Sequence, residues 1–140
     1  METIVDNQKV RITKKLEKMF AHIDYKNPPA LCPVRDVMSV ASDQWSTLII
    51  LWLAYFDTLR FNKLKKYVYG ISNKVLSQRL KALEADGYLK REAFPEVPIR
   101  VEYSLTEFGH SYVERLLELT EWMQKNSPKV LANREQYGLQ

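Results

Sequence analysis

The chain has 140 residues, of which 46% are hydrophobic and 27% charged, a balance typical of one globular domain rather than a disordered segment. Its longest apolar run, Leu48 to Phe56, has nine residues and is too short to cross a membrane. The single cysteine excludes an internal disulfide, and no continuous apolar segment of the signal-peptide kind stands at the N-terminus. We therefore expect a cytoplasmic protein with no membrane partner.

The net charge of +4 is unevenly distributed along the chain. Between Arg60 and Arg91 there are nine Lys or Arg residues and two acids, which gives this segment a balance of +7. The other 108 residues carry 12 basic and 15 acidic side chains and sum to −3. A basic segment within a slightly acidic chain is typical of a nucleic-acid-binding surface.

The N-terminal part is predicted to form an amphipathic helix from about Asp6 to Asp24, which the run Asn27-Pro28-Pro29 separates from the next unit. Its apolar residues recur at helical spacing, but they form only a narrow stripe: Ile12, Leu16, Met19 and Ile23. A stripe this thin does not stabilise an isolated helix, so we expect it to contact a second subunit.

A second unit begins at Cys32, which we predict to be the N-cap of a short helix that starts with Pro33 and ends near Val40. Ser42 or Asp43 then caps a stronger helix with the sequence QWSTLIILWLAYF. This helix is apolar on nearly all sides, which indicates that it lies at the centre of the domain.

The basic segment is predicted to contain a brief strand, Leu59 to Phe61, and two helices. The first helix covers Asn62 to Val68 and ends at Gly70. The second is capped by Ser72, runs to about Ala85 and is stopped by Gly87. The turn between the helices therefore has four residues, Tyr69-Gly70-Ile71-Ser72, as in a helix-turn-helix.

Two alternating segments follow, Tyr88 to Phe94 and Arg100 to Leu105, and the proline-bearing stretch PEVP between them predicts a β-hairpin. Thr106 then caps a long helix that reaches Asn126, and Ser127-Pro128 is expected to restart a weaker final helix. The predicted fold is mainly α with a small β-hairpin: a winged helix-turn-helix with N- and C-terminal dimerisation helices. We divide the chain into an N-terminal helical extension (1–29), the winged-helix domain (30–126) and a tail helix (127–140).

The helix after Ser72 has an apolar face made by Leu76, Leu80 and Leu83 and an opposite row of side chains that all donate hydrogen bonds. That row, Lys74, Ser77, Gln78 and Lys81, contains no acid. In a winged helix-turn-helix the second helix enters the major groove and the hairpin lies over the adjacent backbone, where carboxylates would repel phosphates. The candidate DNA contacts are Lys63, Lys66, Ser72, Asn73, Lys74, Ser77, Gln78, Arg79, Lys81, Lys90 and Arg100.

Five segments together resemble the HxlR-type transcription regulators, a branch of winged-helix proteins akin to the MarR group: CPVRDVM, QWSTLIILWL, LRFNKLKK, GISNKVLSQRLKALEADGYLKRE and PEVPIRVEYSLTEFG. The resemblance runs from about Cys32 to Trp122 and implies a homodimer that binds duplex DNA at an inverted-repeat operator. Relatives commonly have Gly-Gly-Lys-Trp where this chain has Ser42-Asp43-Gln44-Trp45, so a contact made by that lysine is not carried over. The segment before Cys32 is also longer than the family core requires.

Cys32 has two interpretations. A lone cysteine is commonly buried and inert. It can also be a sensor, because an N-cap position and the neighbouring Arg35 both stabilise the thiolate form. Some proteins of the family that the chain resembles sense electrophiles or oxidants through an N-terminal cysteine, which makes Cys32 the candidate redox or effector site. Any disulfide would then join two subunits or a small thiol.

Other chemistry finds little support in the sequence. The chain has only two histidines, His22 and His110, and it has no glycine-rich phosphate loop, catalytic Ser-His-Asp order or His-Glu-x-x-His motif. We expect no enzyme, metal or cofactor. The aromatic residues Trp45, Trp52, Tyr55, Phe56 and Trp122 fit either a core or an effector pocket. The alternative to a DNA-binding regulator is a winged-helix module whose basic face binds a protein.

Overall fold

The computed structural model describes residues 4–21, 23–24, 26–28, 30 and 32–139. The chain divides into two compact units, Met1–Asp36 and Val37–Gln140. The first unit contains α1 (Ile4–Phe20), and none of its side chains is buried. The helix ends at Phe20, so the predicted end at Asp24 was wrong and Ile23 lies beyond it. His22 and Pro29 lie outside the described residues.

The second unit is built around α3 (Gln44–Phe56), which buries Ile49, Ile50 and Leu53 completely. The Asp43 carboxylate caps it, because Oδ1 accepts hydrogen bonds from the backbone N–H groups of Trp45 (2.9 Å) and Ser46 (3.0 Å). The short helix predicted before it is a π-helical turn, η1 (Pro33–Val37), continued by α2 (Met38–Ala41). No single described helix is long and apolar enough to cross a membrane, and the only pair that approaches this, Val34–Ala41 with Gln44–Phe56, is bent by 57°.

The helix-turn-helix consists of α4 (Phe61–Tyr67) and α5 (Asn73–Ala85). Gly70 lies in the turn with a φ of +88°, a conformation that glycine adopts without steric cost. Ser72 caps α5 as predicted, because its Oγ accepts a hydrogen bond of 3.1 Å from the Val75 N–H. The strand before α4 is shorter than expected: β1 covers only Thr58–Leu59, and Phe61 begins α4.

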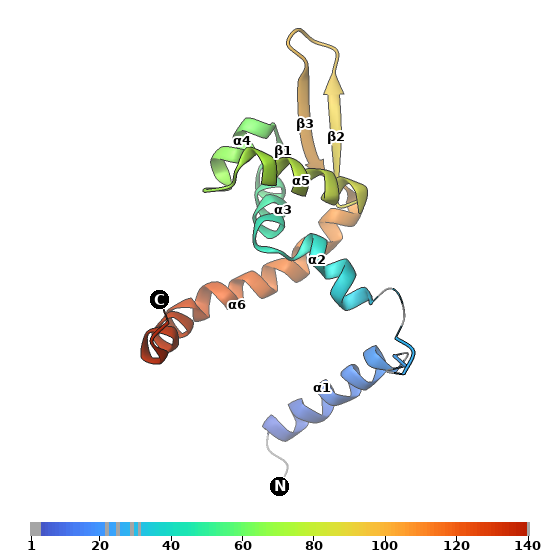
Figure 1. The fold of residues 1–140 in the computed structure, drawn as a ribbon, viewed down its shortest axis with the longest axis vertical. Helices are drawn as coiled ribbons and strands as arrows, with labels where there is room; N and C mark the ends of the chain where they lie inside the picture. The colour runs from blue at the N-terminus through green and yellow to red at the C-terminus, as the bar shows by residue number, and fades with distance from the viewer. Residues whose placement is uncertain (1–3, 22, 25, 29, 31, 140) are drawn as a thin grey trace. The chain divides into compact units, whose positions relative to one another are not determined.

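The wing is an antiparallel hairpin of β2 (Leu89–Phe94) and β3 (Arg100–Leu105), in which Leu89 pairs with Leu105 and Phe94 with Arg100. The strand β1 adds to the outer side of β3, so the sheet order is β1-β3-β2. Figure 1 shows α5 crossing in front of α3, with the hairpin rising from the end of α5. The predicted fold class, mainly helical with a small sheet, is confirmed.

The last helix, α6 (Glu107–Tyr137), is continuous through Pro128, so the predicted restart at Ser127-Pro128 was wrong. Pro128 has no N–H to donate to the carbonyl of Gln124, four residues earlier. The Ser127 hydroxyl donates to that carbonyl instead, at 3.0 Å, and so supplies the missing partner. The boundary between residues 126 and 127 therefore falls inside a helix, and the division into domains stays a prediction.

The first turn of α6 is hydrogen-bonded to the foot of the wing, the residues Gly87 and Tyr88 that directly precede β2. Thr106 caps the helix, since its Oγ1 accepts a hydrogen bond from the Gly109 N–H. Its hydroxyl donates to the carbonyl of Gly87 at 2.5 Å, and its backbone N–H donates to the carbonyl of Tyr88 at 3.1 Å. A methyl group on Gly109 would overlap that same carbonyl oxygen, so only glycine allows this approach. The core thus joins α3, α5, the foot of the wing and the start of α6, with Leu53, Leu80, Leu89 and Leu116 among its buried members.

Candidate nucleic-acid interface

The helix α5 has one face fixed in the core and one face open to solvent. Leu76, Leu80 and Leu83 are at most 2% exposed, so the rotation of the helix about its axis is set by packing. The opposite side chains are all exposed, as the periodicity predicted: Lys74, Ser77, Gln78 and Lys81. A rigidly oriented row of donors of this kind can hydrogen-bond the acceptors on base edges and phosphates.

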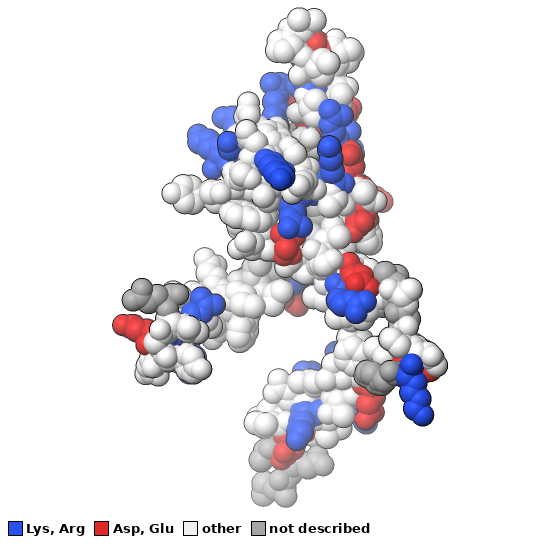
Figure 2. Space-filling view, viewed as in Figure 1, with Lys and Arg blue, Asp and Glu red and all other residues white. Residues whose placement is uncertain are grey.

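Further cations lie beside this row. Lys63 and Lys66 are exposed on α4, and Lys90 is exposed near the start of β2. Figure 2 shows Lys and Arg side chains gathered over α4, α5 and the lower part of the hairpin, whereas the tip of the hairpin carries no basic side chain on this face. Within the described part of the chain, none of the five candidate lysines, Lys63, Lys66, Lys74, Lys81 and Lys90, forms an ion pair.

The N-terminus of α5 has the donor groups that a phosphate-binding site requires. Ser72 and Asn73 are both exposed there, next to backbone N–H groups at the positive end of the helix dipole. The Ser72 Oγ is occupied as an acceptor by the Val75 N–H, but its hydroxyl hydrogen remains available to donate. Hydrogen-bond donors are therefore available at this end of the helix as well as along the donor row.

The two arginines among the candidates differ from the other nine residues. Arg79 and Arg100 are only partly exposed and face carboxylates, whereas the other nine are exposed. Four more exposed residues of the same region are not among the eleven candidates: Arg60, Lys65, Tyr69 and Arg91. Tyr69 is 92% exposed in the turn between α4 and α5. Arg60, Lys65 and Arg91 lie within the basic segment, and this position is the sequence signal that points to them.

Cys32 is half-buried at the start of η1. Its backbone N–H donates to Asp36 Oδ2 at 2.6 Å, and its carbonyl accepts from the Asp36 N–H at 2.7 Å. The Arg35 guanidinium is paired with Asp36, with 2.9 Å between Nε and Oδ1. The hydrogen bond from the Arg35 guanidinium, together with the one from the Cys32 N–H, lowers the pKa of the Asp36 carboxyl to about 2. Much of the positive charge expected to act on the thiol is thus compensated by a carboxylate.

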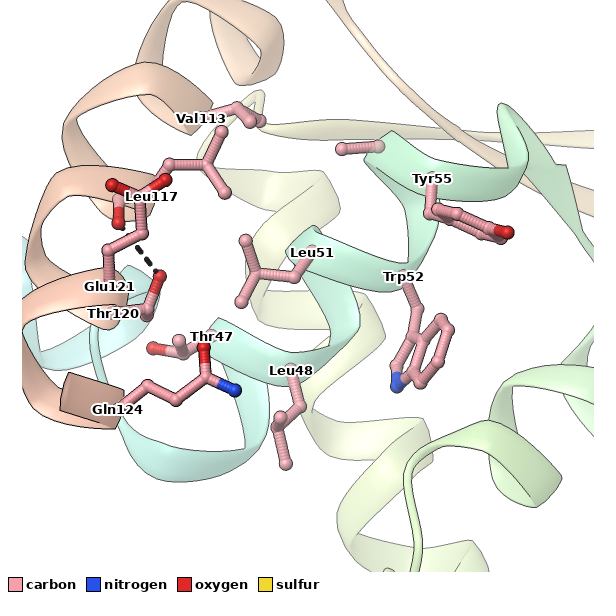
Figure 3. A pocket seen from close by; sticks show the side chains of 11 residues that line it. Thr47, Leu48, Leu51, Trp52, Tyr55, Val113, Leu117, Thr120, Glu121 and Gln124 are labelled. Carbon is pink, nitrogen blue, oxygen red and sulfur yellow. Dashed lines mark hydrogen bonds between the residues drawn. The ribbon is translucent and has the colours of Figure 1, made fainter. Parts of the chain in front are cut away.

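A groove of about 760 Å³ lies between α3 and α6. Figure 3 shows Leu51 and Trp52 of α3 on one side of it and Val113, Leu117 and Thr120 of α6 on the other. Of the five aromatic residues considered for an effector pocket, Trp52 and Tyr55 line this groove. Trp45 and Phe56 pack against the core, and Trp122 is 58% exposed outside the groove. Among the described residues, no three His, Cys, Asp or Glu side chains lie together as metal ligands would.

Comparison with known proteins agrees with this arrangement. The HxlR-like helix-turn-helix family matches residues 40–130, a region that leaves out α1. The HTH-type transcriptional regulator YtfH of Escherichia coli (strain K12) is 43% identical over 105 residues, which are 75% of this chain and 82% of YtfH.

Two solved structures are similar as well. The putative transcriptional regulator YtfH from Salmonella typhimurium has a TM-score of 0.69 at 41% identity, covering 76% of this chain and 95% of that one. The redox regulator HypR in its oxidised form has a TM-score of 0.62 at 35% identity, covering 68% and 97%. The matched region spans the helix-turn-helix, the wing and most of α6. The chain therefore belongs to the HxlR-like helix-turn-helix family of transcriptional regulators.

Proposed function

We propose that this protein is a homodimeric regulator that binds duplex DNA in a sequence-specific way, with α5 in the major groove. The observation that carries the proposal is the exposed, acid-free donor row of α5, held in one orientation by three buried leucines. In this proposal Gln78 and Lys74 read base edges, since glutamine suits adenine and lysine suits guanine. The lysines of α4 and β2 would hold the flanking phosphates.

Selection of bound duplexes from a random pool tests this proposal and returns the operator at the same time. A selected sequence with two inverted half-sites about one helical turn apart, or a multiple of it, is the expected result. Binding should weaken steeply with salt, because each neutralised phosphate adds about −0.9 to the slope of log K against log salt. Failure to retain any duplex would instead favour a winged-helix module that binds a protein.

The dimer rests on the two terminal helices. No side chain of α1 is buried, although Ile12, Leu16 and Met19 form an apolar stripe along it. The outer part of α6 also exposes large apolar residues, including Trp122, Met123 and Leu131. Apolar surface of this extent is typical of a protein interface. Sedimentation of the intact chain at micromolar concentration should therefore give a dimer, and a monomer would contradict it.

Cys32 is the proposed regulatory thiol. HypR, a structural neighbour of this chain, is described as a redox regulator and was solved in an oxidised form. Modification of Cys32 would alter η1, which leads directly into α2 and the domain. Diamide should therefore lower the operator affinity of the wild type and leave the variant Cys32→Ser unaffected. Equal behaviour of the two proteins would make Cys32 a structural residue.

A further inference from the structure

The eleven candidate DNA contacts separate into two groups by exposure. Nine of them are exposed, while Arg79 and Arg100 are only partly exposed, with 38% and 29% of their side-chain surface accessible. Both arginines also lie next to carboxylates, which none of the five lysines does within the described residues. The two arginines thus already have carboxylate partners within the protein, whereas the five lysines do not within the described residues.

Arg79 points away from the donor row of α5. Successive residues of an α-helix are turned by about 100°, so Arg79 lies well around the helix from Gln78, toward the side of Leu76 and Leu83. Its Nη1 is 3.6 Å from Oδ2 of Asp43. The other oxygen of that carboxylate caps α3, where it accepts from the N–H groups of Trp45 and Ser46. Arg79 therefore connects the middle of α5 to the first turn of α3.

Arg100 is held within the wing by three groups. Its Nη2 is 3.2 Å from Glu96 Oε1, and its Nη1 is 3.0 Å from Glu102 Oε1. Its guanidinium carbon lies 3.9 Å from the centre of the Phe94 ring. Phe94 pairs with Arg100 across the hairpin, and Glu96 lies in the turn between the strands. One side chain thus joins both strands and the turn.

The outer half of the wing has no surplus positive charge to offer to DNA. From Glu92 to Glu102 it contains three acids and one base, Arg100, which gives a balance of −2. Glu92 even stands directly opposite Glu102 in the register. The turn exposes apolar side chains instead, with Val97 103% and Ile99 71% accessible. The basic residues of β2, Lys90 and Arg91, lie nearer to the foot of the wing.

We propose that Arg79 and Arg100 are positioning residues, and that the exposed lysines of α4 and β2, together with Lys81 of α5, make the phosphate contacts. Arg79 sets the orientation of α5 against α3, and Arg100 sets the shape of the wing. A guanidinium that is compensated by carboxylates releases few counterions from DNA, so it contributes little to the salt dependence of binding. This inference rests on the proposed function and assigns separate roles within that interface.

The test measures affinity against salt for intact wild type and single variants, on a selected duplex and on a scrambled duplex of the same length. Lys90→Met should flatten the slope by about 2 for a dimer, one phosphate for each subunit. Arg79→Met and Arg100→Met should leave the slope unchanged but reduce the preference for the selected duplex. A variant that merely folded less well would lose affinity equally on both duplexes, and this outcome would overturn the positioning role.

Two variants of the carboxylate partners of the arginines keep the test decisive even where an arginine variant does not fold. Asp43→Asn retains a capping oxygen but loses the charge that faces Arg79, and Glu102→Gln releases one end of Arg100. Both should reduce the preference for the selected duplex, as the arginine variants do. If the arginines instead bound phosphates, both changes would raise affinity on all DNA, and the arginine variants would flatten the slope as Lys90→Met does. Those results would overturn the inference alone, whereas a wild type that binds no duplex would overturn the proposed function with it.

Discussion

The helices α1 and α5 look alike in sequence but differ in what their apolar faces contact. Each has a single apolar stripe and a polar face rich in lysine. In α5 the three leucines of the stripe are completely or almost completely buried. In α1 no side chain is buried, and Leu16 remains 43% exposed.

This difference shows that a basic helix presents its donors in one fixed direction only where a core sets its orientation. The donor row of α5 faces one direction because Leu76, Leu80 and Leu83 cannot leave the core without a large loss of apolar contact. The apolar side chains of α1 are not buried in the described structure, so the charge of its lysines alone assigns them no ligand. What α1 offers is an apolar stripe of which no side chain is buried among the described residues.

The largest effect should come from truncating the buried stripe of α5. Leu80→Ala should lower the free energy of unfolding by about 2–5 kcal/mol, because it removes buried methyl groups and leaves a cavity. The matched change on α1, Leu16→Ala, should alter the unfolding of the core by less than about 0.5 kcal/mol. Urea denaturation of both variants measures the contrast. Similar losses would mean that α1 is packed into the same core.

Removal of α1 should act on assembly rather than on folding. Deleting residues 1–28 should weaken dimerisation by roughly 2–4 kcal/mol, because several half-exposed apolar side chains lose their burial in the second subunit. The helical signal in the circular dichroism spectrum should decrease by the contribution of one helix. The thermal unfolding transition of the core should remain unchanged at high protein concentration. Sedimentation equilibrium measures the dissociation constant. An unchanged constant would assign dimerisation to α6 alone.

A smaller effect is expected at the N-cap of α5. Ser72→Ala should cost about 1 kcal/mol of stability, since the Val75 N–H loses its acceptor. Ser77 lies on the exposed face of the same helix and serves as the control. Ser77→Ala should change the free energy of unfolding by less than about 0.5 kcal/mol while it alters DNA binding. Thermal unfolding with operator titration separates the two roles.

The smallest effect concerns the first unit and its pH dependence. The pKa of Asp36 is lowered to about 2, so its ion pair with Arg35 and its bond to the Cys32 N–H support η1 at neutral pH. Because the folded pKa is lowered, this support is complete above the ordinary carboxyl pKa near 4 and is lost as the pH falls toward 2. An NMR titration of the Asp36 carboxyl carbon should show its midpoint near 2. A midpoint near 4 would show that the pair does not persist in solution.

Local signals in the sequence predicted most of the elements correctly. The caps Ser72 and Thr106 and the buried leucines of α5 follow from side-chain chemistry within one or two helical turns. The break at Pro128 was wrong because the Ser127 hydroxyl replaces the missing donor, a compensation that composition does not reveal. The assignment of Phe61 to a strand was wrong because a two-residue strand leaves no pattern to extend.

The candidate interface was predictable where it depends on the periodicity of one helix. The exposed row of α5 follows from the spacing of its leucines. The pairing of Arg79 with Asp43 does not, because the two residues are distant in sequence and meet only when α5 packs against α3. Arg100 lies close to Glu96 and Glu102 in sequence, yet only the hairpin geometry places both carboxylates on its guanidinium. Residue type alone therefore did not reveal that these two arginines are paired with carboxylates within the chain.

The most direct test of the proposed function is the affinity of wild type and Gln78→Ala for a selected duplex and for a scrambled duplex at one salt concentration, measured by fluorescence anisotropy. Gln78 lies at the centre of the exposed row, and loss of a bidentate base contact costs roughly 1–3 kcal/mol for each base pair read. The variant should therefore bind the selected duplex about 5- to 150-fold more weakly for each half-site and bind the scrambled duplex as the wild type does. Equal losses on both duplexes, or none on either, would contradict base reading by α5.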